Sequence, residues 1–138
     1  MRTMTKIKST YIGNLHCEAV HLDSGAKICT SAPKDNNGEG DCFSPTDLFA
    51  ASLGCCMMTI MGIAARTHGF SVDGTTVTTE KVMAANPRRV AELRLEIDFP
   101  KDANYTDKQK EIIERAAHTC PVGNSLHPDI KEVIVFNY

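Results

Sequence analysis

Two cysteines in different surroundings are the residues of this sequence best suited to chemistry. Cys56 lies near the end of the apolar run Ser-Pro-Thr-Asp-Leu-Phe-Ala-Ala-Ser-Leu-Gly-Cys-Cys-Met at positions 44–57, and Cys120 lies in His-Thr-Cys-Pro-Val-Gly-Asn at positions 118–124. An oxidant can convert one thiol to a sulfenic acid, and a second thiol can resolve that acid to a disulfide. These two thiols are therefore the minimum set of groups that two-cysteine redox chemistry requires.

The local sequence gives the two thiols different expected properties. Pro121 suits the first position of a short helix, so Cys120 is predicted to cap that helix. Its sulfur would then lie at the positive end of the helix dipole, where a thiol ionises more easily. The apolar neighbours of Cys56 disfavour a thiolate, so Cys56 needs a cation or a hydrogen-bond donor from elsewhere in the fold. A structural alternative stays open at this point, namely that Cys55 and Cys56 are two small core residues.

Length and charge limit the possible classes of protein. The chain has 138 residues and a formal net charge of -2. A single domain over residues 1–138 can bury about 70% of the surface of its unfolded chain, so folding needs no disulfides. The composition offers no basic patch for nucleic acid or a membrane surface. Residues 1–8 precede no apolar leader segment, and no stretch approaches the roughly 20 apolar residues of a membrane span. We therefore expect a cytoplasmic protein whose six cysteines are mostly thiols.

The first half of the chain predicts a small sheet followed by one long helix. Residues 6–12, 15–22 and 26–31 have the pattern of an antiparallel meander, and the turn-forming residues at 33–41 predict a surface loop. Ser44 and Asp47 form the pattern of a capping box for a helix that extends to about residue 68. This helix is hydrophobic nearly all round, and a second copy of the chain is the simplest cover for it.

The second half predicts a hairpin, an amphipathic helix and a closing strand. Residues 70–83 and 89–99 form the hairpin, residues 106–117 the helix and residues 133–136 the last strand. The residues expected to face the core are Val90, Leu93, Leu95, Ile97, Phe99, Ile112, Ile113 and Ala116.

Two segments resemble the OsmC/Ohr family of osmotically inducible and organic hydroperoxide resistance proteins. Residues 44–56 are similar to the family's helix start Asn-Pro-Glu-Glu-Leu-(Leu/Phe)-Ala-Ala-x-x-x-Ala-Cys, which places Cys56 on the peroxide-attacking cysteine. Residues 120–124 are similar to the segment Cys-Pro-(Val/Tyr)-Ser-(Asn/Lys), which places Cys120 on the resolving cysteine. The resemblance implies an α+β, OsmC-like fold, in which antiparallel sheets pack on long central buried helices in an intertwined homodimer.

The resemblance also implies a thiol peroxidase that acts in the response to oxidative stress. A Cys56 sulfenic acid would form on an organic hydroperoxide, and Cys120 would resolve it to a disulfide. An external thiol, such as a dihydrolipoyl group or another dithiol, would reduce the disulfide, with no bound cofactor. The apolar side chains of Phe49, Leu53 and Met57 suit an organic substrate. The alternative is an OsmC-fold protein that binds a small ligand or senses oxidation without efficient peroxidase turnover.

The sequence departs from the family pattern around the reactive sulfur. In the family an arginine of the N-terminal strands and a glutamate early in the long helix flank that sulfur. Here residues 3–42 contain no arginine, and the glutamate position falls on Thr46, which is followed by Asp47. Asp47 precedes Cys56 by about 13 Å along an ideal helix, so the cap is its favoured role over a catalytic one. Other candidates for a supporting charge are His16, Lys34, Arg115 and His118.

A metal site is not predicted. Cys55, Cys56, His118 and Cys120 offer ligand types that zinc accepts, but neighbouring cysteines on a helix point about 100° apart, and the usual Cys-x2-Cys and His-x3-His spacings are missing. Cys17, Cys29 and Cys42 are interpreted as packing thiols or incidental surface thiols.

Overall fold

The computed structural model describes residues 3–138, so Met1 and Arg2 of the predicted basic start lie outside the described residues. The chain forms two compact units, Met1–Leu48 and Phe49–Tyr138. We describe each by itself. Their boundary falls inside the long helix, and the single domain over residues 1–138 stays a prediction.

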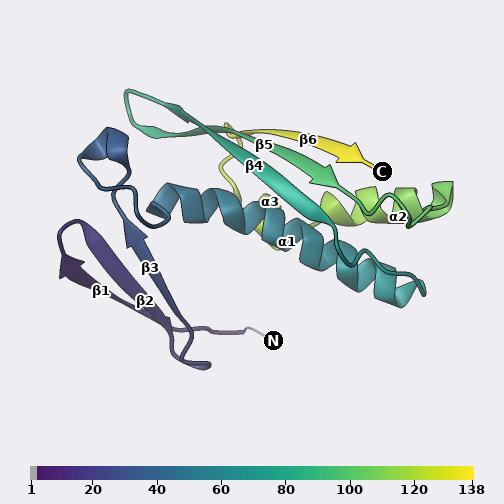
Figure 1. The fold of residues 1–138 in the computed structure, drawn as a ribbon, viewed down its shortest axis with the longest axis horizontal. Coiled ribbons are helices and arrows are strands. Elements are labelled where there is room, and N and C mark those ends of the chain that lie inside the picture. The colour runs from purple at the N-terminus through teal and green to yellow at the C-terminus, as the bar shows by residue number, and fades with distance from the viewer. Residues whose placement is uncertain (1–2) are drawn as a thin grey trace. The chain divides into compact units, whose positions relative to one another are not determined.

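The N-terminal unit is built on an antiparallel sheet in the order β1-β2-β3 (Figure 1). Its strands are β1 (Ile7–Gly13), β2 (His16–His21) and β3 (Lys27–Ser31), which confirms the predicted meander. The predicted loop contains the short 3-10 helix η1 (Lys34–Asn36) and then returns to the sheet, where Phe43 forms a parallel bridge with Thr30. The returning loop is thereby tied to the edge strand.

Helix α1 (Pro45–Thr67) begins with the predicted capping box. The Asp47 N–H donates to Ser44 Oγ, and the Ser44 N–H donates to Asp47 Oδ2, both at 3.0 Å. Each end of the box satisfies a backbone donor that a helix start leaves without an intrahelical partner. Asp47 therefore serves as a cap residue, as favoured from the sequence.

One face of α1 belongs to the core, and the other is open. The buried positions recur every three or four residues, as in a helix that packs on one side: Ala50, Leu53, Gly54, Met57, Met61 and Ala65. Residues Phe49 and Ile63 are 38% and 57% exposed on the opposite side. An 18-residue window of this helix has a mean hydropathy of 1.9, which is apolar enough for a membrane span by composition. The expectation that no stretch approaches that limit was therefore wrong, although a core helix passes the same test.

The C-terminal unit contains a mixed sheet in the order β4-β5-β6. Strands β4 (Thr76–Ala84) and β5 (Arg89–Asp98) form the predicted hairpin, while β6 (Lys131–Asn137) pairs with β5 in parallel. The expected α+β architecture with antiparallel strand pairing is confirmed, and β6 adds a parallel strand to the second sheet. The connection from β5 to β6 carries helices α2 (Asp107–Ala117) and α3 (Pro121–Ser125), and a crossover of that length permits parallel pairing.

The predicted alternation of β5 is confirmed in its central part. Leu93, Leu95, Ile97 and Phe99 are at most 3% exposed and pack against the helices beside the sheet. A register shift near Val82 accommodates one extra residue, so Val90, three residues before Leu93, still packs half-buried against the core cluster that contains Leu93. The predicted strand from residue 70 begins only at Thr76, since residues 70–75 contain a turn at residues 73–74 and no strand.

Helix α2 matches the predicted helix over residues 106–117, and it is capped by Thr106, whose side chain accepts from the Gln109 N–H at 3.1 Å. Ile113 is fully buried and Ala116 is 7% exposed, so both face the core as expected. Ile112 does not, because it is only half-buried and lines a surface hollow. The helix thus turns one apolar stripe inward and leaves one isoleucine at the surface.

Candidate functional site

Cys56 and Cys120 meet in the C-terminal unit. Cys120 is buried at 1% exposure in a cluster with Leu53 and Met57, and Cys56 is half-buried and packs against that cluster. The Cys56 thiol also lies close enough to Cys120 to contribute to the raised pKa of the Cys120 thiol. The structure therefore brings together the two sulfurs that the sequence singled out.

Helix α3 fixes the position of the Cys120 sulfur. As predicted, Cys120 is the N-cap of α3 and Pro121 follows at its first position. The Cys120 Sγ accepts from the Gly123 N–H at 3.2 Å. A Cβ added at Gly123 would meet the same sulfur at 3.2 Å and the Leu53 Cδ1 at 3.7 Å. The glycine thus allows the α3 backbone to approach both the sulfur and the core.

The expectation that Cys120 ionises more easily at its cap position is wrong. Burial is the largest influence and raises the pKa of Cys120, because a thiolate loses solvation in an apolar core. The Gly123 N–H acts in the opposite direction, while the hydrogen bond with Cys56 and the negative charge of Glu132 raise the pKa further. One backbone donor on a helix of a single turn does not outweigh desolvation.

Glu132 is a member of this site that the sequence did not reveal. Its Oε1 would lie 3.8 Å from a Cβ added at Gly123, and its charge acts on Cys120. Glu132 lies on β6, where it pairs in parallel with Leu93 of β5. Only the register of this long-range pairing brings its carboxylate near the sulfur, so no local pattern could have predicted it.

Of the three residues predicted to form a substrate pocket, Phe49 lines a hollow, whereas Leu53 and Met57 are at most 1% exposed and belong to the core. The hollow of about 230 Å³ is lined mainly by α3 residues, including Pro121 and Val122. This small hollow lies beside the helix that Cys120 caps.

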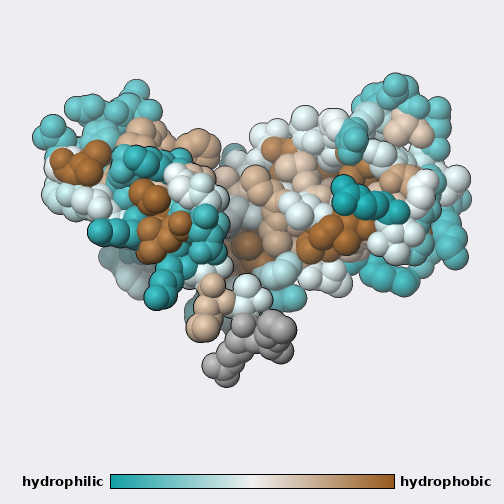
Figure 2. All heavy atoms as spheres, turned by 90° about the horizontal axis from the view of Figure 1, so that it is seen from below, coloured by the Kyte–Doolittle hydropathy of each residue, from teal (hydrophilic) through white to brown (hydrophobic). Residues whose placement is uncertain are grey.

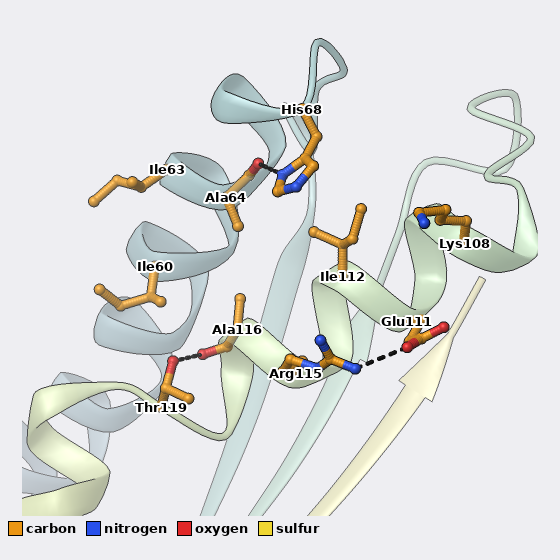
Figure 3. Close-up of a pocket in the computed structure, with 10 residues that line it drawn as sticks. All are labelled: Ile60, Ile63, Ala64, His68, Lys108, Glu111, Ile112, Arg115, Ala116 and Thr119. Carbon is orange, nitrogen blue, oxygen red and sulfur yellow. Dashed lines mark hydrogen bonds and ion pairs between the residues drawn. The ribbon is translucent and has the colours of Figure 1, made fainter.

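A larger hollow of about 480 Å³ lies between α1 and α2 (Figure 3). Its α1 wall is apolar and includes Ile60 and Ile63, and its α2 wall carries Lys108, Glu111 and Arg115. The Arg115 guanidinium donates to Glu111 Oε1 at 2.8 Å across one helical turn. This predicted supporting cation is therefore engaged with a carboxylate at an exposed position.

The other predicted supporting residues also have structural partners. The exposed ring of His118 makes an edge contact with the ring of Phe136, with centroids 6.2 Å apart. In the N-terminal unit, Thr46 Oγ1 lies 3.3 Å from Ser44 Oγ within the cap of α1, next to Asp47. Among the described residues, Glu132 is a charged group that acts on the Cys120 thiol, and it is an anion rather than the expected cation.

Hydrophobic residues also occupy part of the surface of the C-terminal unit. On the right of Figure 2 they form a broad patch bordered by hydrophilic residues. The large hydrophobic side chains that are exposed on this unit are those of Phe49, Ile63 and Val135. The N-terminal unit separately leaves Ile7, Tyr11 and Ile28 of its sheet exposed. Exposed apolar surfaces of this kind are typical of interfaces with another molecule.

Comparisons with known proteins agree on one family. The family model described as OsmC-like protein matches residues 38–133. A proposed osmotic stress induced and detoxification response protein of Psychrobacter arcticus 273-4 is 47% identical, covers 99% of this chain and 98% of its own, and superposes with a TM-score of 0.91.

Two more distant structures share the fold. The organic hydroperoxide resistance protein OsmC of Legionella pneumophila is 19% identical over 99% of this chain and 98% of its own, with a TM-score of 0.77. An organic hydroperoxide resistance protein of Elizabethkingia anophelis is 21% identical over 99% of both chains, with a TM-score of 0.72. No curated protein matches the chain significantly.

Proposed function

The chain belongs to the OsmC-like protein family, and we propose that it reduces organic hydroperoxides to alcohols with Cys56 and Cys120. Family membership supports a stress-related or redox-related role. The single observation that carries the finer proposal is the contact between the half-buried Cys56 thiol and the buried Cys120 thiol.

The proposed reaction has three balanced steps. The Cys56 thiolate attacks the distal peroxide oxygen, the O–O bond breaks, and an alcohol leaves while Cys56 becomes a sulfenic acid. The Cys120 sulfur then attacks the sulfenic sulfur, forming a disulfide and releasing water. An external dithiol, such as a dihydrolipoyl group, reduces the disulfide to two thiols and becomes oxidised itself.

The difference in burial supports the proposed division of roles. Cys56 is the more accessible sulfur of the pair and meets the peroxide, whereas Cys120 is 1% exposed and reaches only its neighbour. The apolar residues around both sulfurs favour an alkyl or aryl hydroperoxide over hydrogen peroxide. Phe49, at the edge of the small hollow, is the residue best placed to contact such a group.

The proposal includes a cytoplasmic homodimer. The exposed Ile63 on α1 and the exposed apolar side chains of the N-terminal sheet need cover, and a second copy of the chain supplies complementary apolar surface. A reducing compartment returns the disulfide to thiols between turnovers.

Steady-state reduction of cumene hydroperoxide with a dithiol tests the proposal. We expect turnover by the wild type, loss of turnover in Cys56→Ser, and a single oxidation without turnover in Cys120→Ser. Cys55→Ser is the matched control, because Cys55 is the exposed neighbour on the same helix and should retain activity. Wild-type turnover by Cys56→Ser would refute the proposal.

A second candidate is a redox sensor that forms the same disulfide without efficient turnover. Its supporting observation is the raised pKa of Cys120 beside Glu132, which slows resolution of the sulfenic acid. Mass spectrometry after one equivalent of peroxide distinguishes the two when combined with the steady-state assay. A Cys56–Cys120 disulfide with no steady-state turnover indicates the sensor, and a disulfide with turnover indicates the peroxidase.

A further inference from the structure

A second group of reactive side chains lies in the N-terminal unit. The ligand atoms of His16, Asp41 and Cys42 all lie within 4.8 Å of one another. The Cys29 Sγ is 3.4 Å from the Cys42 Sγ, and the His16 Nε2 is 3.0 and 3.1 Å from the two Asp41 carboxylate oxygens. One imidazole, one carboxylate and two thiols therefore converge from separate parts of the chain.

Sheet register places two of these groups on one face. His16 pairs with Ser31, and Glu18 pairs with Cys29, in the antiparallel ladder of β2 and β3. Side chains alternate between faces along a strand and paired residues share a face. His16 and Cys29 are therefore diagonal neighbours on the same side of the sheet.

The backbone of the returning loop fixes the other two groups. Ser31 is only 2% exposed, and its Oγ accepts from the Cys42 N–H at 3.1 Å. The Ser31 N–H donates to the Phe43 carbonyl at 3.0 Å. Cys42 and the adjacent Asp41 are thereby held against the sheet by a buried side chain and a backbone bridge, so the convergence does not depend on surface side chains alone.

Both ring nitrogens of His16 have partners, Nδ1 the Asn14 carbonyl and Nε2 the Asp41 carboxylate, so a cation would bind Nε2 by displacing the proton that Nε2 shares with Asp41. The His16 Nδ1 lies 2.6 Å from the Asn14 carbonyl, which can only accept, so Nδ1 carries a proton. In the neutral ring Nε2 then has a lone pair that faces the Asp41 carboxylate. Two facing electron-pair donors need either a proton or a cation between them. A backbone carbonyl on the remote nitrogen is also the usual support of a metal-binding histidine.

We propose that His16, Cys29, Asp41 and Cys42 form a binding site for Zn²⁺ or a divalent cation of similar ligand preference. The cation replaces the thiol protons of Cys29 and Cys42 and the proton between His16 Nε2 and Asp41, all of which are released to solvent, and it binds His16 through Nε2 and Asp41 through a carboxylate oxygen. Thiolate together with imidazole is a donor set that selects zinc-type cations over Mg²⁺ and Ca²⁺.

The distances among three of the four ligands are close to those of such a site. Tetrahedral zinc with ordinary bond lengths spaces its ligand atoms about 3.3 to 3.8 Å apart. The thiol pair at 3.4 Å and the imidazole–carboxylate pair at 3.0 Å need to open by only a few tenths of an ångström. The other distances among His16, Asp41 and Cys42, within 4.8 Å, need to close by about 1 to 1.5 Å. Cys29 lies outside that group and contacts Cys42, so its side chain must move toward His16 and Asp41 when the cation binds. The interpretation of Cys29 and Cys42 as incidental thiols missed this convergence.

Titration of the reduced protein with Co²⁺, followed by displacement with Zn²⁺, tests the proposal. We expect one ion per chain, with thiolate-to-cobalt absorbance that Zn²⁺ abolishes. Cys29→Ser, Cys42→Ser and His16→Ala should each weaken Zn²⁺ binding by at least about 100-fold, because even changes behind the ligands cost 10- to 100-fold. Cys17→Ser is the matched control, since Cys17 follows His16 on the other face of β2.

Two further measurements keep the outcome clear. Cys56→Ser should bind Zn²⁺ like the wild type, so this site and the proposed peroxidase can fail independently. NMR of the wild-type protein during Zn²⁺ addition should shift the signals of residues 16, 29, 41 and 42 first, whether or not a variant folds. Absence of thiolate-to-cobalt absorbance, unchanged affinity in Cys29→Ser and Cys42→Ser, or shifts centred on Cys56 and Cys120 would each overturn the proposal.

Discussion

Replacement of Leu53 by alanine tests whether the α1 core holds the sulfur pair in place. Leu53 is fully buried, and its Cδ1 would lie 3.7 Å from a Cβ added at Gly123, in the helix that Cys120 caps. The substitution removes three carbon atoms from a closed site and leaves a cavity. Such changes destabilise proteins by about 3 to 5 kcal/mol. A loss of about 3 kcal/mol lowers the folding equilibrium constant by roughly 150-fold.

The same substitution should slow disulfide formation. With Leu53 shortened, α3 loses a packing partner and the Cys120 sulfur can move relative to Cys56. A misplacement of about 1 Å can cost up to 100-fold in rate, so we expect disulfide formation after one equivalent of peroxide to slow by about 10-fold or more. Leu53→Met is the matched control, because it conserves volume and should cost less than about 1.5 kcal/mol.

Urea unfolding and rapid-quench mass spectrometry measure the two effects. The slope of the unfolding free energy against urea should be unchanged, so that the shift in midpoint reports stability alone. A cost below about 1 kcal/mol for Leu53→Ala, or wild-type disulfide kinetics in a destabilised but folded variant, would refute the coupling between this core position and the pair.

Three further predictions concern pH, the cap of α1 and assembly. Because the pKa of Cys120 is raised, its thiolate is scarce at neutral pH, and the rate of disulfide formation should rise with pH. Glu132→Gln should shift this rate profile to lower pH, because it removes a negative charge that raises the pKa of Cys120. An unshifted profile would exclude an influence of the Glu132 carboxylate on the sulfur. Asp47→Ala should lower the free energy of unfolding by about 1 kcal/mol in urea titrations, with the rate of Cys56 oxidation unchanged in the folded fraction; a slowed oxidation would restore a catalytic role to Asp47. Ile63→Glu should convert the proposed homodimer to monomers in analytical ultracentrifugation, because it places a charge on the exposed apolar face of α1; a dimer of wild-type affinity would locate the interface elsewhere.

Features of the fold that depend on neighbouring residues were predictable from the sequence. The capping boxes at Ser44 and Thr106 and the Cys120–Pro121 helix start are local hydrogen-bond patterns, and the structure contains all three. The alternation along β5 is equally local, because one face of a half-buried strand carries every second side chain. These patterns correctly predicted the elements that carry the two sulfurs, namely α1 for Cys56 and the start of α3 for Cys120.

Features that depend on long-range register were not predictable in the same way. Glu132 approaches Cys120 only because β6 pairs in parallel with β5, and the sequence does not state that pairing. The ionisation of Cys120 was misjudged for a related reason. Its cap position is visible in the sequence, but its burial depends on the packing of Leu53 and other core residues around it.

Prediction of the cluster formed by His16, Cys29, Asp41 and Cys42 would have required three structural facts together. The β2–β3 register, the return of the loop at Phe43 and the buried Ser31 each contribute one constraint. Spacing rules for zinc sites search for ligands that are close in sequence, so ligands spread over a sheet and a loop escape them. Cross-strand pairing of β2 and β3, considered face by face, is the signal that would have grouped His16 with Cys29.

The two thiol pairs of this chain differ in what surrounds them, and the chemistry proposed for each follows from that difference. Cys56 and Cys120 pack in an apolar cluster, and the carboxylate of Glu132 acts on Cys120. A disulfide needs only two sulfurs, so such a site suits redox chemistry, whereas a metal ion would lack two further ligands. Cys29 and Cys42 lie beside an imidazole and a carboxylate on a polar surface, where those further ligands are present. A bound cation would occupy both of these thiols and so confine oxidation to the apolar pair.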